Sequence, residues 1–222
     1  MISIQHVCRS YPLMHGKIKH VLRDISIDFN EGCSTAILGL NGAGKSTLIR
    51  IICGAEQPDS GRVIRKAKIS WPIGLSGGIN GSLSGKQNLR FVSRIYGADI
   101  NEVAAYVKDF AELGDYMDMP VKTYSSGMKS KLIFGLAMAI GFDFYLVDEA
   151  LSVGDAAFRR KAQNELIKRC LNSTMIFVSH SESTVRNLCK AGAVLNEGKL
   201  KYFPDINDAL KYYKEICDAK AK

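Results

Sequence analysis

Residues 39–47 read GLNGAGKST, and Gly39 to Ser46 match the pattern G-x-x-x-x-G-K-[ST] in full. The stretch STAILGL, residues 34–40, leads into the loop as a short apolar run that predicts a buried strand. The stretch KSTLIRIICG, residues 45–54, places apolar side chains on one face of a predicted helix that stops at Gly54. Such a loop turns backbone N–H groups and the positive end of a helix toward a phosphate. The stretch therefore predicts a phosphate-binding loop in an α/β fold.

Residues of the loop, together with a second strand end, predict a nucleotide site. Lys45 is expected to reach the outer phosphates, and the Ser46 hydroxyl to ligate magnesium. Asp148 ends the apolar run FYLV at the carboxyl edge of the predicted sheet, where its carboxylate can hold the magnesium water shell. Its neighbour Glu149 is placed to polarise an attacking water. The rest of the loop is expected to surround the phosphates: Gly39, Leu40, Asn41, Gly42, Ala43, Gly44 and Thr47.

A second Gly-Lys pair ends the glycine-rich stretch WPIGLSGGINGSLSGKQN, residues 71–88. The phosphate-loop pattern fails there, because Asn80 stands where the first glycine is required and Gln87 follows the lysine in place of Ser or Thr. Without that hydroxyl the pair has no magnesium ligand. Gly85 is therefore expected to begin a helix.

Composition sets limits on the kind of protein. The chain has 222 residues, of which 46% are hydrophobic and 23% charged, so it can bury a core and is not predicted to be disordered. No signal peptide is recognisable at the start, and the longest apolar run, residues 132–142, is too short to span a bilayer. The six cysteines form no C-x-x-C pair, which predicts free thiols in a reducing compartment. The net charge of +8 comes from scattered Lys and Arg, which favours attraction to an anionic membrane surface over nucleic-acid binding.

The apolar patterns also predict the order of elements. Alternation at residues 2–4 and 22–29 predicts half-buried strands, and residues 85–140 are mostly helical. FYLVDE and TMIFVSH predict buried strands separated by a helix, and residues 191–203 predict a hairpin before a terminal helix. The expected fold is α/β, with a mainly parallel sheet core, an antiparallel N-terminal β subdomain and a helical lobe.

Four motifs in order resemble the nucleotide-binding subunit of ATP-binding cassette (ABC) transporters: GLNGAGKST, YSSGMKSK, FYLVDEALSVGD and FVSHS. The resemblance runs from Tyr11 to the hairpin near Gly198. It implies one ABC nucleotide-binding domain over residues 1–222, with a core of about 1–84 and 141–222 and a helical lobe of about 85–140. It also implies ATP and Mg²⁺ as cofactors.

The resemblance assigns further roles. Tyr11 matches the aromatic residue that stacks on adenine, and His180 matches the switch histidine that assists Glu149 and Lys45 in hydrolysis. YSSGM matches the ABC signature, usually LSGGQ, with departures at Ser126 and Met128. In the family this segment contacts the γ-phosphate held by the other subunit, and the loop SVGD crosses the dimer interface. The residues so implied to contact nucleotide are Ser125, Ser126, Gly127 and Asp155.

The resemblance implies partners as well. Two cassettes would form a homodimer that sandwiches two ATP molecules, and a separate membrane permease would dock near Trp71 to Ser84. In most members that loop carries a glutamine which touches magnesium, but none stands near Gly74 or Leu75, so no such ligand is assigned. The protein is expected at the cytoplasmic face of the inner membrane, as a peripheral part of a larger envelope export complex, without nucleic acid.

Three longer stretches of the sequence resemble one branch of the family and so indicate the transported cargo. SWPIGLSGG, TYSSGMKSKLIFGLAMAI and DEALSVGDAAF resemble cassette subunits of capsular-polysaccharide exporters of Gram-negative bacteria, which are related to O-antigen and teichoic-acid exporters. The alternatives are a cassette for O-antigen, teichoic acid or another cargo, and a soluble ABC ATPase of translation or DNA repair. A phosphate-loop small-molecule kinase is a third alternative, but it would lack the signature and the switch histidine.

Overall fold

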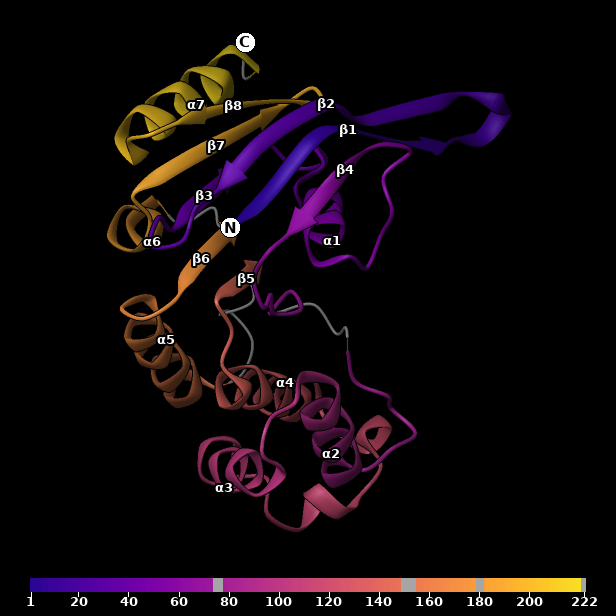
Figure 1. Cartoon of the computed structure of the whole chain (residues 1–222), viewed down its shortest axis with the longest axis vertical. Helices are drawn as coiled ribbons and strands as arrows, with labels where there is room; N and C mark the ends of the chain where they lie inside the picture. The colour runs from indigo at the N-terminus through magenta and orange to yellow at the C-terminus, as the bar shows by residue number, and fades with distance from the viewer. Residues whose placement is uncertain (74–77, 149–154, 179–181, 221–222) are drawn as a thin grey trace. The chain divides into compact units, whose positions relative to one another are not determined.

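The computed structural model describes residues 1–73, 78–148, 155–178 and 182–220. Several residues named from the sequence lie outside these described residues: Gly74, Leu75, Glu149, His180 and most of the SVGD loop. Helices and strands follow in the order β1 (Ile2–Pro12), β2 (Ile18–Phe29), β3 (Thr35–Leu38), α1 (Lys45–Cys53), β4 (Ser60–Arg65), α2 (Gly85–Tyr96), α3 (Ile100–Ala111), α4 (Ser126–Ile140), β5 (Phe144–Asp148), α5 (Ala156–Cys170), β6 (Thr174–Val178), α6 (Glu182–Leu188), β7 (Ala191–Asn196), β8 (Lys199–Phe203) and α7 (Ile206–Lys220) (Figure 1).

The contacts divide the chain into two compact units. The first holds residues 1–72, 143–148 and 172–222, and contains both sheets. The second holds residues 73–142 and 149–171, and contains α2 to α5.

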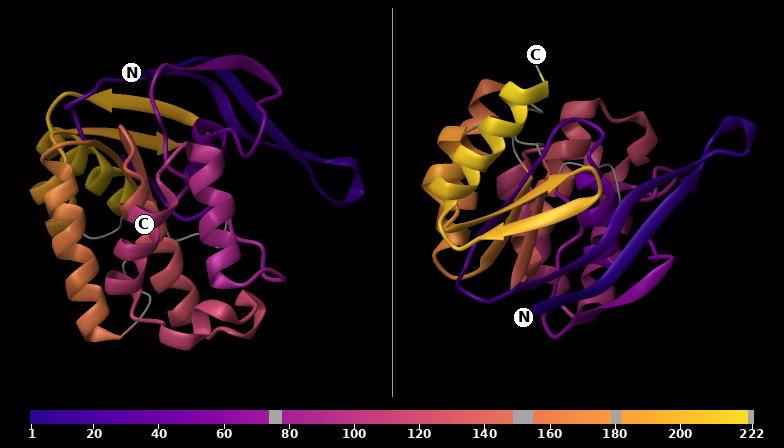
Figure 2. Two further views of the ribbon diagram at one scale, coloured as in Figure 1. Left: turned by 60° about the horizontal axis from the view of Figure 1, so that its bottom comes forward. Right: turned by 90° about the horizontal axis from the view of Figure 1, so that it is seen from above.

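An antiparallel sheet of three strands, in the order β2-β1-β4, forms the N-terminal part of the first unit. Ile4 pairs with Ile27 on one side and with Val63 on the other. Buried and exposed residues alternate in the second half of β2, as expected for an antiparallel sheet with one side toward the core. The hairpin that joins β1 and β2 extends beyond the rest of the sheet (Figures 1 and 2). The three-stranded sheet confirms the predicted antiparallel N-terminal β subdomain.

The second sheet has five strands in the order β5-β6-β3-β7-β8. The first four are parallel, and β8 runs antiparallel to β7 through the predicted hairpin. Every residue of β3 and β6 is buried, which is why these strands appear in the sequence as unbroken apolar runs. Helix α7 packs on β7 so closely that a Cβ on Gly192 would lie 2.3 Å from the Cβ of Ala209. The four parallel strands confirm the predicted, mainly parallel sheet core.

Helices of the second unit pack through aromatic side chains. The rings of Phe110 on α3 and Phe134 on α4 stack with centroids 5.4 Å apart, and Phe158 on α5 meets Phe110 edge-on at 5.7 Å. On α2, Leu89 is buried, but Ile95 is 60% exposed. At 100° per residue, Ile95 lies about 120° around the helix from Leu89.

No helix among the described residues is long and apolar enough to cross a membrane.

Candidate active site

The loop of residues 39–44 lies where the sequence predicts it, between the end of β3 and the first residue of α1. Gly44 precedes the helix with φ +109°, and Gly54 ends it in the left-handed conformation. At the far end of α1, Arg65 donates hydrogen bonds to the carbonyls of Ile51 and Ile52, at 2.6 and 2.7 Å. A cation at that end offsets the negative pole of the helix, while the positive pole faces the loop.

Two loop glycines are required by close contacts with neighbouring strands. A Cβ on Gly39 would lie 2.4 Å from the carbonyl oxygen of Leu195 in β7. A Cβ on Gly44 would lie 2.7 Å from Cγ1 of Val21 in β2. The loop is therefore held between strands of both sheets, and no larger residue fits at either position.

Gly39→Ala is expected to lower the free energy of unfolding by about 1–3 kcal/mol, because the added methyl group overlaps a main-chain oxygen that cannot move alone. Urea denaturation followed by circular dichroism measures this loss. Gly135→Ala in α4 is the matched control, since its Cβ would meet neighbours at an ordinary 3.6 Å or more. Equal stability of Gly39→Ala and the wild type would contradict the steric account.

The Lys45 side chain folds back over the loop. Its Nζ donates hydrogen bonds to the carbonyls of Gly39 at 2.7 Å and Leu40 at 3.1 Å, and the residue is only 9% exposed. Ser46 is exposed, and Thr47 is buried beneath it. The structure thus places one cation and one accessible hydroxyl at the start of α1.

Asp148 lies at the same edge of the sheet as the phosphate loop. It pairs with Val178 of β6, and Val178 pairs with Ile37 of β3, two residues before Gly39. Parallel strands that end together bring their last side chains to one edge, where ligands bind in open α/β sheets. The structure therefore brings together Lys45, Ser46 and Asp148 on neighbouring elements of one unit.

The signature residues lie at a helix start in the second unit. Ser125 caps α4, and its hydroxyl accepts a hydrogen bond from the backbone N–H of Met128 at 3.2 Å. Ser126 and Gly127 are the first residues of that helix, and both Ser125 and Ser126 are exposed. Free N–H groups of a first helical turn are a ready anion site.

Asp155 caps α5 in the same unit. Its carboxylate accepts a hydrogen bond from the backbone N–H of Phe158 at 2.7 Å and pairs with Lys131 at 3.2 Å. The N–H of Phe158 and then the Lys131 ammonium lower the pKa of this carboxyl. The family resemblance assigned Asp155 to the nucleotide. In this structure its carboxylate caps the first turn of α5.

The second Gly-Lys pair is explained by a helix start. Gly85 begins α2, as predicted, and Ser84 and Gln87 form a capping box with each other's backbone N–H groups. Gln87, which replaces the hydroxyl residue of a phosphate loop, is thus the closing member of the cap. A Cβ on Gly85 would lie 2.6 Å from the Tyr124 hydroxyl, so tight packing accounts for this glycine.

A charged cluster around Tyr11 was not predicted from the sequence. The Tyr11 hydroxyl donates to the carboxylate of Glu56, which also accepts from Arg9 Nε at 2.7 Å and Arg50 Nε at 2.9 Å. The Glu56 side chain is only 14% exposed. The strand spacing of Arg9 and Tyr11 was a usable signal, because residues two apart share a face. Nothing in the sequence links either of them to Glu56.

The cluster sets the pKa of Glu56. Burial alone would raise it, but the hydrogen bonds from Tyr11, Arg50 and Arg9 together hold the pKa below its usual 4.5. A carboxyl whose pKa is lower in the folded than in the unfolded state stabilises the fold above the unfolded value, and this contribution is lost as pH falls through the folded value.

Glu56→Gln is therefore expected to lower the free energy of unfolding by about 1–3 kcal/mol at pH 7, and by less at acid pH, because the wild-type carboxyl loses its charge as pH falls through its lowered folded-state pKa. Urea midpoints at pH 7 and at acid pH measure the difference. Glu215→Gln, on an exposed position of α7, is the control and should show little change. A deficit that does not shrink as pH is lowered through the acid range in which the wild-type carboxyl is protonated would contradict the role of the charge.

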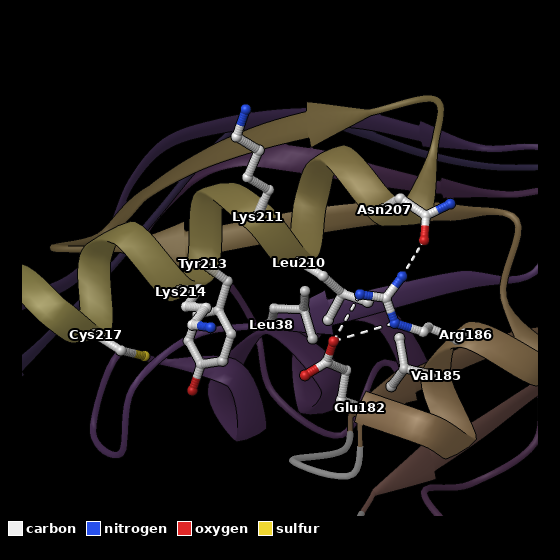
Figure 3. A pocket seen from close by; sticks show the side chains of 10 residues that line it. All are labelled: Leu38, Glu182, Val185, Arg186, Asn207, Leu210, Lys211, Tyr213, Lys214 and Cys217. Carbon is white, nitrogen blue, oxygen red and sulfur yellow. Dashed lines mark hydrogen bonds and ion pairs between the residues drawn. The ribbon is translucent and has the colours of Figure 1, made fainter.

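A pocket of about 450 Å³ lies between α6 and α7, with Leu38 of β3 among the residues that line it (Figure 3). Arg186 donates hydrogen bonds to Glu182 and Asn207 along its side (Figure 3). None of the described residues assigned to the nucleotide lines this pocket.

Comparisons with known proteins agree with this geometry. The family model described as "ABC transporter" matches residues 22–152. The polysialic acid transport ATP-binding protein KpsT of Escherichia coli is 46% identical, over 97% of this chain and 99% of its own length. The capsule polysaccharide export ATP-binding protein CtrD of Neisseria meningitidis serogroup B is also 46% identical, over 97% of this chain and 100% of its own length.

Solved structures show the same fold. The dimeric post-hydrolysis ATP-binding cassette MJ0796, bound to ADP and Pi, covers 91% of this chain and 97% of its own, with a TM-score of 0.76 at 19% identity. The family match exceeds half of the chain, and the two relatives match along nearly their whole length. This chain belongs to the family of ABC transporter ATP-binding proteins.

Proposed function

We propose that this protein is the ATP-hydrolysing subunit of an exporter that moves capsular polysaccharide across the inner membrane with a separate permease. The observation that carries the proposal is the full-length match at 46% identity to two ATP-binding proteins named for polysialic acid transport and capsule polysaccharide export. Lys45, Ser46 and Asp148 on neighbouring elements support the ATPase part. A single ABC nucleotide-binding domain over residues 1–222 is part of the proposal.

The loop and the first turn of α1 would bind the phosphates of ATP through backbone N–H groups, and Lys45 would contact the β- and γ-phosphates. The Ser46 hydroxyl and the Asp148 carboxylate are the hard oxygen donors that Mg²⁺ prefers, so the residues present fit this ion. Bound there, Mg²⁺ would neutralise charge that develops on the transferred phosphoryl group. Tyr11 would stack on adenine.

Glu149 would orient and deprotonate the water that attacks the γ-phosphate, and His180 would stabilise the charge that develops there. The start of α4, with Ser125, Ser126 and Gly127, would bind the γ-phosphate held by the partner subunit. Hydrolysis then requires a two-fold dimer of cassettes that closes on two ATP molecules, with Asp155 near the interface.

The permease would dock near the segment from Trp71 to Ser84, at the cytoplasmic face of the inner membrane. This placement makes the protein a peripheral member of an envelope export complex, without nucleic acid. The glycines of the segment would allow it to change shape as ATP is bound and released.

Complementation tests the cargo. In an Escherichia coli strain that lacks KpsT, this chain is expected to restore polysaccharide at the cell surface, and Lys45→Ala should leave the polysaccharide inside the cell. Co-purification of a membrane permease from detergent extracts checks the partner. Active ATPase that restores no surface polysaccharide, while the KpsT control does, would favour O-antigen, teichoic acid or another cargo.

A further inference from the structure

The ring of Tyr11 is covered on one face by Arg9. Both residues lie on β1 and are two positions apart, so their side chains project from the same side of the strand. The guanidinium carbon of Arg9 lies 4.9 Å from the centre of the Tyr11 ring. Contacts of this kind between a cation and a ring are attractive. A base that stacks on Tyr11 therefore uses the opposite face.

Arg9 is fixed by the loop that joins α1 to β4. Its Nη1 donates to Asp59 at 2.6 Å, and its Nε donates to Glu56 at 2.7 Å. The loop is tied to the same strand by main-chain contacts, from the N–H of Asp59 to the carbonyl of Cys8 at 2.9 Å and from the N–H of Ser10 to Asp59 at 2.7 Å. Strand and loop thus form one rigid support.

The Tyr11 hydroxyl is fixed as well. Besides its hydrogen bond to Glu56, it lies 3.4 Å from Thr47 Oγ1 and 3.4 Å from Arg50 Nη2, both on α1. Thr47 directly follows Ser46, so the ring is anchored to the helix that begins at the phosphate loop. A tyrosine held at its tip and on one face cannot turn about its side-chain bonds.

We propose that Glu56 and Arg9 are positioning residues for the adenine of ATP. Glu56 fixes the Tyr11 hydroxyl against α1, and Arg9 supports one face of the ring, so that the other face is presented at a set distance from the phosphate loop. Preorganisation of this kind raises affinity by removing the entropy cost of ordering the ring on binding. The inference rests on the proposed stacking role of Tyr11.

Separate measurements on ATP and on inorganic tripolyphosphate test the proposal, because tripolyphosphate carries the phosphates without the base. Tyr11→Phe keeps the ring and removes the hydroxyl, and Glu56→Ala removes its acceptor. Each is expected to weaken ATP binding about 3- to 10-fold and leave tripolyphosphate binding unchanged. In the ATPase assay KM for ATP should rise by the same factor, with kcat within about 2-fold of the wild type. The double variant Tyr11→Phe/Glu56→Ala should bind ATP no more weakly than whichever single variant has the lower ATP affinity, because both changes remove the same hydrogen bond.

Two further variants distinguish failure of the positioning role from failure of the stacking role of Tyr11. Arg62→Ala, whose guanidinium bonds Gln5 in the same sheet, should bind both ligands as the wild type does. Tyr11→Ala should weaken ATP binding about 10-fold or more through loss of stacking, and unchanged binding would overturn the stacking role itself. If Tyr11→Ala weakens ATP binding but Tyr11→Phe and Glu56→Ala do not, stacking stands and positioning is overturned. Equal loss of ATP and tripolyphosphate in Glu56→Ala and Tyr11→Phe would also overturn positioning, because it indicates general damage to the site.

Discussion

Lys45→Ala is expected to reduce ATP hydrolysis at least about 100-fold and to weaken ATP binding about 10-fold or more. The Lys45 ammonium lies on the phosphate loop, bonded to the carbonyls of Gly39 and Leu40. Its removal takes away the positive charge that the outer phosphates would meet and leaves two loop carbonyls without that donor. Phosphate release measures the rate, and calorimetry measures the affinity.

The chain contains its own control for this experiment. Lys86 also follows a glycine, but it lies at the start of α2, is exposed and pairs with Asp118 at 2.8 Å. Lys86→Ala should leave ATP binding and hydrolysis unchanged, because an exposed ion pair contributes little. Loss of hydrolysis in both variants would contradict the assignment of Gly39 to Ser46 as the phosphate loop.

Glu149→Gln is expected to lower turnover about 10²- to 10⁴-fold while ATP binding persists. Glutamine retains the shape of the side chain but cannot take a proton from the attacking water. ATP should therefore accumulate in a closed dimer, which size-exclusion chromatography with and without ATP would detect. The measurement compares single-turnover hydrolysis with ATP affinity in the same preparation.

Glu102→Gln is the control for this second variant, since Glu102 is exposed in the first turn of α3. It should hydrolyse ATP at the wild-type rate. Normal turnover by Glu149→Gln would remove Glu149 from the catalytic role, and His180 would then be the next residue to replace. Loss of ATP binding by Glu149→Gln would instead indicate that the glutamate is needed to form the site.

The features that could be predicted from the sequence are those encoded by short, continuous stretches of it. The loop between β3 and α1 follows from a glycine pattern between two apolar periodicities, and the helix start at Gly85 follows from the failure of that pattern. The parallel strands follow from unbroken apolar runs such as residues 144–147. Each signal lies within about ten residues of chain.

Contacts between segments that are distant along the chain could not be predicted from the sequence. Glu56 meets Tyr11 only because the loop after α1 returns to β1, and no local pattern encodes that return. Side-chain partners of this kind are set by tertiary packing.

The sheet order has a consequence for synthesis on the ribosome. Strand β3, which carries the phosphate loop, is made early, but both of its hydrogen-bonded neighbours, β6 and β7, lie in the last quarter of the chain. Until they emerge, β3 exposes two unpaired edges and an apolar surface, and its loop lacks the Leu195 carbonyl against which Gly39 packs. Pairings so distant in sequence form slowly. The nascent chain should therefore gain nucleotide binding only near the end of translation, and before then it is a substrate for chaperones.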